Sequence, residues 1–302
     1  MREPWRYLPP RWQDAILSVD PDILTRVEEI RFRANVSVRL YTDRECVLLH
    51  PHGQDLVTSA EELRRILEVL VDHSLYARVD ELRQGFITLP GGHRVGVAGR
   101  AVWQGGEVIT QTDISGLNIR CARMVEGMAE PLVRILRTRG IQGNSWLVVA
   151  APRAGKTTLL RELTRWFSEK ALRVTVVDER FEIAGLWSGS PGFFLGPHTD
   201  VLSGWSKVEG IFTALRSLGP DLIVVDELGG IEDETALLQA RYAGVDVLAS
   251  VHGPRAADVH PGSRVQKLWD SGMFDAVVFL DREPRVGSIR SVWPGKRDVA
   301  SG

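Results

Sequence analysis

The sequence lacks the features of a disulfide-rich, zinc-binding or membrane-spanning protein. Its 302 residues include only two cysteines, Cys46 and Cys121, which do not form a CxxC pair. A disulfide framework or a zinc site is therefore not expected, and a reducing cytoplasm fits best. No apolar run approaches the ~20 residues that span a bilayer, and the first ten residues contain no apolar signal-peptide core. We expect no integral membrane segment, so any work at a membrane would go through a partner at its periphery.

An excess of charge of one sign is missing as well. The formal net charge is -2, with 37 basic and 39 acidic side chains, so no global field draws the chain to nucleic acid. Nucleic acid is therefore an unexpected partner. The 44% hydrophobic and 25% charged content is typical of a globular protein.

The sequence pattern changes character near residues 140–144. Before that point, residues 61–70 carry the helical stripe Leu63, Ile66, Leu67 and Leu70. Residues 84–110 alternate around two glycine pairs, which indicates antiparallel hairpins. We predict a smaller α+β N-terminal domain over residues 1–140.

After residue 144, apolar runs of strand length alternate with helical patterns. This alternation predicts a mainly parallel sheet covered on both faces, in an α/β domain over residues 141–302. A helix is expected from Lys156 to Phe167. The expected strands are residues 146–150, 174–177, 222–225, 245–251, 276–280 and 286–292.

The segment AAPRAGKTT at residues 150–158 follows a predicted strand and opens a predicted helix. A loop in this position, the Walker A position, aims backbone N–H groups and a helix N-terminus at phosphate oxygens. Lys156 would reach the β- and γ-phosphates of ATP, and the Thr157 hydroxyl would bind Mg²⁺. Ala150 replaces the usual first glycine, which requires a negative φ there. An ordinary strand-to-helix turn is the weaker interpretation. The predicted ATP-binding residues are Pro152, Arg153, Ala154, Gly155, Lys156, Thr157 and Thr158.

A second segment, LIVVDE at residues 222–227, is an apolar strand that ends in two acids. In an open α/β sheet such strand ends lie at the ligand crevice. Asp226 would hold Mg²⁺, and Glu227 would polarise the attacking water. Many strands end in solvated carboxylates, so the segment gains its meaning from the loop about seventy residues earlier.

Two further strand ends carry polar groups. Residues 176–183 bring Asp178, Glu179, Arg180 and Glu182 to the end of one strand. Residues 247–253 bring Ser250 and His252 to the end of another. We expect both ends at the same crevice. His252 is either a γ-phosphate sensor or a histidine satisfied at a strand terminus, and the two interpretations are about equally supported.

Together these motifs resemble the type II/type IV secretion ATPases among the RecA-like P-loop proteins. Arg216, Pro220, Asp221 and Glu227 fall on characteristic positions of that superfamily, and Glu182 matches its outer Asp-box glutamate. The chain resembles the stage III sporulation protein AA family more closely, across nearly its whole length. That resemblance is carried by GHRVGVAGRA (92–101), ISGLNIR (114–120), VDERFEIAG (177–185) and HTDVL (198–202). Gly230 departs from the secretion ATPases, which carry arginine there.

The resemblance implies a RecA-like ATP-hydrolysing motor with a smaller N-terminal domain. It implies a ring, expected to be a hexamer, that acts in the mother cell at the engulfed forespore. The partners would be membrane proteins of a sporulation channel or secretion complex. It also implies that an N-terminal arginine completes the site, with Arg100 the first choice and Arg120 the second. Lys156, Glu227, Glu182 and His252 complete the expected catalytic set.

Two other functions stay open on the sequence alone. A nucleotide-gated scaffold would use ATP binding to assemble the complex, with turnover incidental. A DNA-directed RecA-like ATPase is suggested by the basic segment at residues 285–297, although no nucleic-acid module is recognisable.

Overall fold

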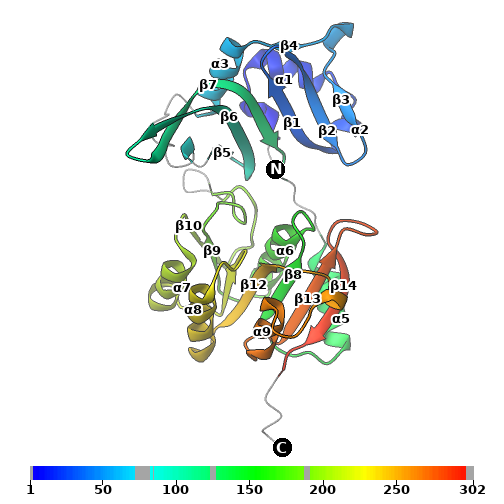
Figure 1. Ribbon diagram of the computed structural model, residues 1–302. Coiled ribbons are helices and arrows are strands. Elements are labelled where there is room, and N and C mark those ends of the chain that lie inside the picture. The colour runs from blue at the N-terminus through cyan, green and yellow to red at the C-terminus, as the bar shows by residue number, and fades with distance from the viewer. Residues whose placement is uncertain (1–2, 72–81, 84, 123–126, 187–190, 297–302) are drawn as a thin grey trace, which may run out of the picture. The chain divides into compact units, whose positions relative to one another are not determined.

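The computed structural model describes residues 3–71, 82, 83, 85–122, 127–186 and 191–296 (Figure 1). Contacts divide the chain into two compact units: residues 1–123 with 187–192, and residues 124–186 with 193–302. We predicted a division near residue 140. The contact grouping instead assigns residues 124–140 to the second unit, where α5 (Ala129–Thr138) packs on α6 (Lys156–Glu169).

The first unit is an antiparallel sheet with helices on its buried face. Its strand order is β3-β2-β1-β7-β6-β5, and β4 pairs with β2. A core that includes Trp12, Phe32, Ile66 and Ile119 lies between sheet and helices. The helical elements are η1 (Pro4–Tyr7), α1 (Pro10–Leu17), α2 (Pro21–Leu24), η2 (Pro51–Gly53) and α3 (Ala60–Leu70). The strands are β1 (Val27–Arg33), β2 (Val36–Thr42), β3 (Cys46–Leu48), β4 (Val57–Thr58), β5 (Phe86–Leu89), β6 (His93–Gln104) and β7 (Glu107–Arg120).

Local signals in the sequence explain two features of this unit. The Ser59 hydroxyl accepts a bond from the Glu62 N–H at 3.1 Å, and the Glu62 carboxylate accepts one from the Ser59 N–H at 2.9 Å. This capping box begins α3 at Ala60, which confirms the predicted helix. The glycine pairs at residues 91–92 and 105–106 have positive φ and lie between β5, β6 and β7, which confirms the predicted hairpins.

The second unit is built on a seven-stranded sheet in the order β10-β9-β11-β12-β8-β13-β14. All neighbouring pairs are parallel except β13 with β14. The strands are β8 (Trp146–Ala150), β9 (Val174–Asp178), β10 (Thr199–Ser203), β11 (Leu222–Val225), β12 (Asp246–His252), β13 (Ala276–Asp281) and β14 (Ser288–Pro294). The further helical elements are α7 (Lys207–Ser217), α8 (Ile231–Tyr242), η4 (Ala256–Asp258) and α9 (Arg264–Asp270). This mixed α/β architecture confirms the predicted fold class.

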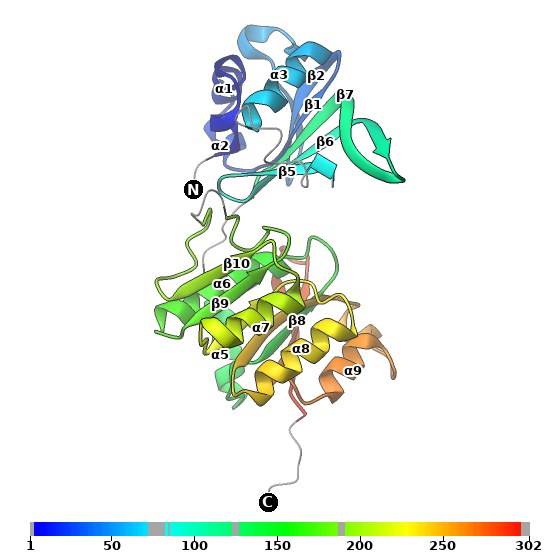
Figure 2. The same cartoon turned by 90° about the vertical axis from the view of Figure 1, so that its left-hand side faces the viewer.

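Helices cover both faces of this sheet. In Figures 1 and 2, α7, α8 and α9 lie on one face, and α5 and α6 lie on the other. All five residues of β8 are buried, as a strand between two helical layers requires. Leu159, Leu160, Leu163 and Phe167 of α6 are at most 1% exposed. Burying each of these side chains stabilises the fold by roughly 1.5–3 kcal/mol, so the position of α6 on the sheet is firmly set.

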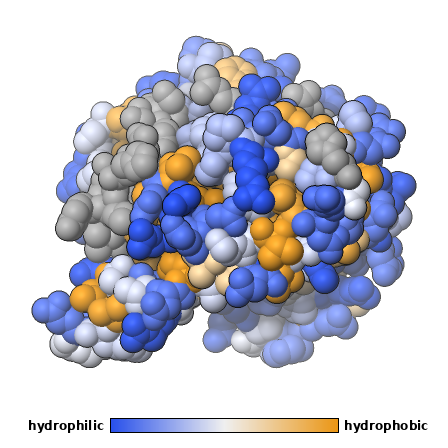
Figure 3. All heavy atoms as spheres, turned by 90° about the horizontal axis from the view of Figure 1, so that it is seen from above, coloured by the Kyte–Doolittle hydropathy of each residue, from blue (hydrophilic) through white to orange (hydrophobic). Residues whose placement is uncertain are grey.

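The remaining surface bears on membrane contact and redox state. Within the described residues, no helix combines the length and the apolar character that crossing a bilayer requires. Cys46 is exposed and Cys121 is partly buried, and the two are not joined in a disulfide. The face seen in Figure 3 is mostly hydrophilic with scattered hydrophobic groups. Exposed apolar side chains such as Trp103 of β6 are ordinary on a globular surface.

Candidate functional site

The loop after β8 has the backbone geometry of a phosphate cradle. Gly155 is the N-cap of α6 with φ +91°, in the left-handed region, and Arg153 has φ +60°. No side chain of the described residues caps the first turn of α6, so its N–H groups are open to an anion. Ala150 is the buried last residue of β8 without a positive φ, which meets the condition that alanine imposes there.

The loop after β8 is held by the Lys156 side chain and by the β13–β14 connection. The Lys156 ammonium donates to the carbonyls of Ala150 at 3.3 Å and Ala151 at 3.4 Å. Arg282, in the β13–β14 connection, donates to the Pro152 carbonyl at 3.0 Å. A Cβ at Gly155 would lie 3.1 Å from the Gly287 Cα of the same connection. The loop therefore carries no spare room on that side.

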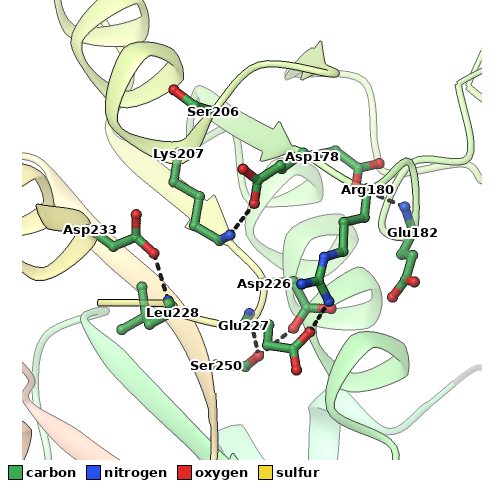
Figure 4. A network of polar contacts seen from close by, with 12 residues as sticks. Asp178, Arg180, Glu182, Ser206, Lys207, Asp226, Glu227, Leu228, Asp233 and Ser250 are labelled. Atoms are coloured by element: carbon green, nitrogen blue, oxygen red, sulfur yellow. Dashed lines mark hydrogen bonds and ion pairs between the residues drawn. The ribbon is translucent and has the colours of Figure 1, made fainter. Parts of the chain in front are cut away.

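Thr157 and Asp226 meet although 69 residues separate them. The Thr157 hydroxyl donates to the Asp226 carboxylate at 2.5 Å. Strand β12 lies between β8 and β11, and its Ser250 donates to the other Asp226 oxygen (Figure 4). The two Asp226 oxygens thus accept bonds from α6 and from β12.

Glu227 has an unusual backbone that Ser250 also supports. Its φ is +54°, which is uncommon for a residue with a side chain. The Glu227 N–H donates to the Ser250 hydroxyl at 2.9 Å, and the next N–H, of Leu228, donates to the Ser250 carbonyl at 2.8 Å. The Glu227 carboxylate accepts a bond from the Arg180 guanidinium. Strained backbone of this kind is found where surrounding bonds over-determine it.

The turn after β9 is fixed by two buried charged groups. The Asp178 carboxylate accepts the N–H groups of Glu182 at 2.8 Å, Ile183 at 3.2 Å and Ala184 at 2.8 Å. Burial still raises the pKa of Asp178 above its ordinary value, because it outweighs those bonds. Arg161 of α6 donates to the carbonyls of Ile183 at 2.9 Å and Glu182 at 2.6 Å.

Arg161 itself shows how costly this support is. Its guanidinium lies 3.8 Å from the Phe193 ring centroid and is 7% exposed as a residue. Burial lowers its pKa to about 10, although Asp178, Asp226 and Glu182 favour the charge. Arg161 thus remains a buried cation that holds the turn after β9 by its carbonyls.

Acids from two strand ends line one narrow cleft. Its walls include Asp178, Glu179, Glu182, Asp226 and Glu227. The cations among the lining residues are Arg180 and Lys207. Lys207, at the start of α7, is 7% exposed and donates to the Glu179 carboxylate. The structure thus brings Glu182 and Glu227 into one cleft, as expected from their strand ends.

Three further predicted residues lie on other strands, β6, β7 and β12. His252 is exposed at the end of β12, where it is opposite Ala150 of β8 in the strand register. Arg100 and Arg120 belong to the first unit, on β6 and β7. Arg100 forms an exposed ion pair with Asp113 at 2.6 Å, and such a pair contributes little to stability.

The residue chemistry suits a triphosphate with a hard cation. Thr157 and Asp226 offer two oxygen ligands, the kind that Mg²⁺ prefers, and phosphate and water usually supply the others. Among the described residues, no cluster of three or more His, Cys, Asp or Glu side chains could hold a metal ion. A cation here would therefore depend on the nucleotide that accompanies it.

The predicted site set left out the supporting groups. Arg161 and Lys207 were not singled out, and Ser250 was noted only for its place on a strand end. Arg161 had a signal in the sequence, since it is a charged residue among the leucines of α6. The sequence carries no signal for Lys207 or for the partners of Ser250, because the residues that they contact are distant in the sequence.

Comparisons with known proteins agree with this architecture. The family model described as "Sporulation stage III, protein AA" matches residues 13–299. The chain is 36% identical to stage III sporulation protein AA of Bacillus subtilis, over 100% of this chain and 97% of that protein. The fold is similar to that of the Legionella pneumophila ATPase DotB, with a TM-score of 0.60 at 15% identity, over 89% of this chain and 76% of DotB. It is also similar to the ADP-bound pilus retraction motor PilT, with a TM-score of 0.58 at 15% identity, over 90% and 80%. The chain belongs to the stage III sporulation protein AA family and has the RecA-like fold of secretion ATPases.

Proposed function

We propose that this protein binds ATP with Mg²⁺ at the loop after β8 and hydrolyses it. The observation that carries the proposal is the 2.5 Å bond between Thr157 and Asp226. It places a helix N-terminus with open N–H groups beside a carboxylate from a second strand end. A magnesium–phosphate site uses both groups, because N–H groups bind phosphate and oxygen ligands bind the cation.

Each residue of the loop has a role in this proposal. The N–H groups of residues 152–158 surround the phosphates, and Lys156 leaves the carbonyls of Ala150 and Ala151 for the β- and γ-phosphate oxygens. Thr157 and Asp226 hold Mg²⁺, which neutralises charge on the transferred phosphoryl group. Glu227 orients the attacking water and accepts its proton.

The remaining predicted residues have supporting roles in this proposal. Glu182 lies in the same cleft as Glu227 and is the alternative group for activating water. His252, at the end of β12, senses the γ-phosphate. Arg100 or Arg120, from an N-terminal unit, adds positive charge at the site. Arginine fingers of this kind raise the rate of hydrolysis by ~10³–10⁵-fold.

At the level of the cell, we infer a motor for a sporulation complex. The family match and the fold shared with DotB and the pilus retraction motor PilT support this proposal. The chain would form a hexameric ring in the mother cell, peripheral to the membrane that faces the forespore. Its partners would be membrane proteins of a channel or secretion complex.

Phosphate release tests the enzymatic part directly. With Mg-ATP, the full chain should release phosphate. Lys156→Ala should lower the rate at least ~100-fold, because the positive charge that stabilises the transferred phosphoryl group is lost. Lys170→Ala is the matched control, since Lys170 is the exposed C-cap of the same helix. Glu227→Gln should keep ATP binding and lose turnover. Absence of Lys156-dependent turnover in an assembled ring would exclude hydrolysis, and a Glu227→Gln strain that still sporulates would favour the nucleotide-gated scaffold.

A further inference from the structure

The turn that carries Arg180 is built to hold its position. Asp178 accepts three N–H groups of the turn, and Arg161 donates to two of its carbonyls. Asp178 is 2% exposed and Arg161 is 7% exposed. The Arg180 backbone is therefore fixed at the edge of the acid-lined cleft, while its own side chain is 58% exposed.

The Arg180 guanidinium occupies the carboxylate that should activate water. Its Nη1 donates to the Glu227 Oε2 (Figure 4). Glu227 cannot turn away at its backbone, because Ser250 holds its N–H. While Arg180 donates to Oε2, that oxygen of Glu227 cannot also accept the proton of an attacking water. Turnover through this oxygen therefore requires the pair to open.

The pair is weak enough to open when a stronger anion arrives. Both side chains are about half exposed, 58% and 45%, and exposed ion pairs contribute little to stability. A terminal phosphate carries more negative charge than one carboxylate and forms charge-assisted bonds with a guanidinium. The other cation lining the cleft, Lys207, is buried against Glu179, so Arg180 is the one able to move.

We propose that Arg180 exchanges Glu227 for the terminal phosphate of ATP. This inference rests on the proposed function of the site. The exchange frees Glu227 and adds positive charge where negative charge develops. In the step itself, a water oxygen bonds to the γ-phosphorus, the bond from that phosphorus to the β–γ bridging oxygen breaks, and the water proton goes to Glu227. ADP and phosphate result.

Variants at Arg180 test the exchange. Arg180→Gln should lower kcat ~100-fold or more, and it should lower the affinity for a non-hydrolysable ATP analogue relative to ADP by about tenfold, the effect of losing one charged bond. Arg180→Lys should recover part of both. Arg173→Gln is the control, because Arg173 makes a similar exposed pair with Asp221 at the opposite end of β9 and β11. It should leave both quantities within about twofold.

The alternatives give different results. If Arg180 only restrains Glu227, Arg180→Gln raises kcat, and the exchange is overturned. An unchanged kcat with an unchanged analogue-to-ADP affinity ratio also overturns it. A wild-type chain that binds ATP without turnover sinks the proposed hydrolysis alone, and the affinity ratio still decides the role of Arg180. Thermal unfolding of each variant separates these effects from loss of folding.

Discussion

The Ser250 side chain contacts both residues that follow β11, Asp226 and Glu227. Its hydroxyl donates to Asp226 and accepts from the Glu227 N–H, and it is fully buried. One side chain therefore sets the carboxylate of Asp226 and the backbone of Glu227. Outer groups of this kind typically change metal affinity or activity by 10–100-fold.

Ser250→Ala should lower kcat by about 10–100-fold with a smaller change in KM. The reason is that the Asp226 carboxylate and the Glu227 backbone lose their common support, although the nucleotide loop stays intact. Steady-state phosphate release measures both constants. Ser203→Ala is the control, because the Ser203 hydroxyl is buried at the end of β10 and has no hydrogen-bond partner in the described part of the chain. Equal losses in both variants would contradict the role given to Ser250.

Residue chemistry could be predicted only where it lies next to a pattern. Lys156 and Thr157 open a helix and Asp226 follows a strand, and the sequence marks both elements clearly. The support by Arg161 and Ser250 depends on contacts across 22–24 residues of intervening fold. Pairings of that kind arise from the packing of α6 and β12 on the sheet, which no local spacing encodes.

The sequence did not predict that the β13–β14 connection contacts the loop after β8. Arg282 holds the Pro152 carbonyl, and Gly287 lies against Gly155. A Cβ at Gly287 would come within 2.2 Å of the Met128 Cε, and the Gly287 φ is +84°. The loop after β8 thus contacts the β13–β14 connection, about 130 residues further along the chain.

Gly287→Ala should displace the hairpin and weaken ATP binding by about tenfold, with a loss of ~1 kcal/mol or more in the free energy of unfolding. Gly262→Ala separates backbone strain from crowding, because Gly262 has φ +82° but nothing within 4 Å of its Cβ position. It should cost stability without changing the ATP affinity. Calorimetric ATP titration and denaturant unfolding give both values, and unchanged ATP binding in Gly287→Ala would contradict the role of the hairpin.

Buried strands were the easiest elements to predict. Residues 146–150 and 222–225 match β8 and β11 because apolar runs of this length have few other uses in an α/β protein. Strand β10 (Thr199–Ser203) was missed, since it is a half-exposed edge strand with only two apolar residues, Val201 and Leu202. At an edge, pairing with β9 outweighs local preference.

At the scale of the molecule, the α/β fold class could be predicted because helical patterns separate most of the apolar runs of strand length. The grouping of residues 124–140 differs from the prediction for a physical reason. α5 is amphipathic, with Leu132, Val133 and Leu136 buried, and its partner is α6. An apolar helical stripe shows that a helix is buried, but it does not show against which unit.

The ring remains a proposal about the whole molecule. A heterologous interface that closes by rotation would let one subunit supply Arg100 or Arg120 to the site of the next. Both arginines lie in the first unit, and the nucleotide loop lies in the second. A site completed between subunits would make turnover depend on assembly.

The most direct test of nucleotide binding is a calorimetric titration of the full, folded chain with Mg-ATP and with Mg-ADP. Binding at the loop predicts a Kd below about 1 mM for both, within the range of substrate affinities that enzymes use, and at least tenfold weaker ATP binding in Lys156→Ala. Neither nucleotide producing heat with the folded wild-type chain would contradict the account.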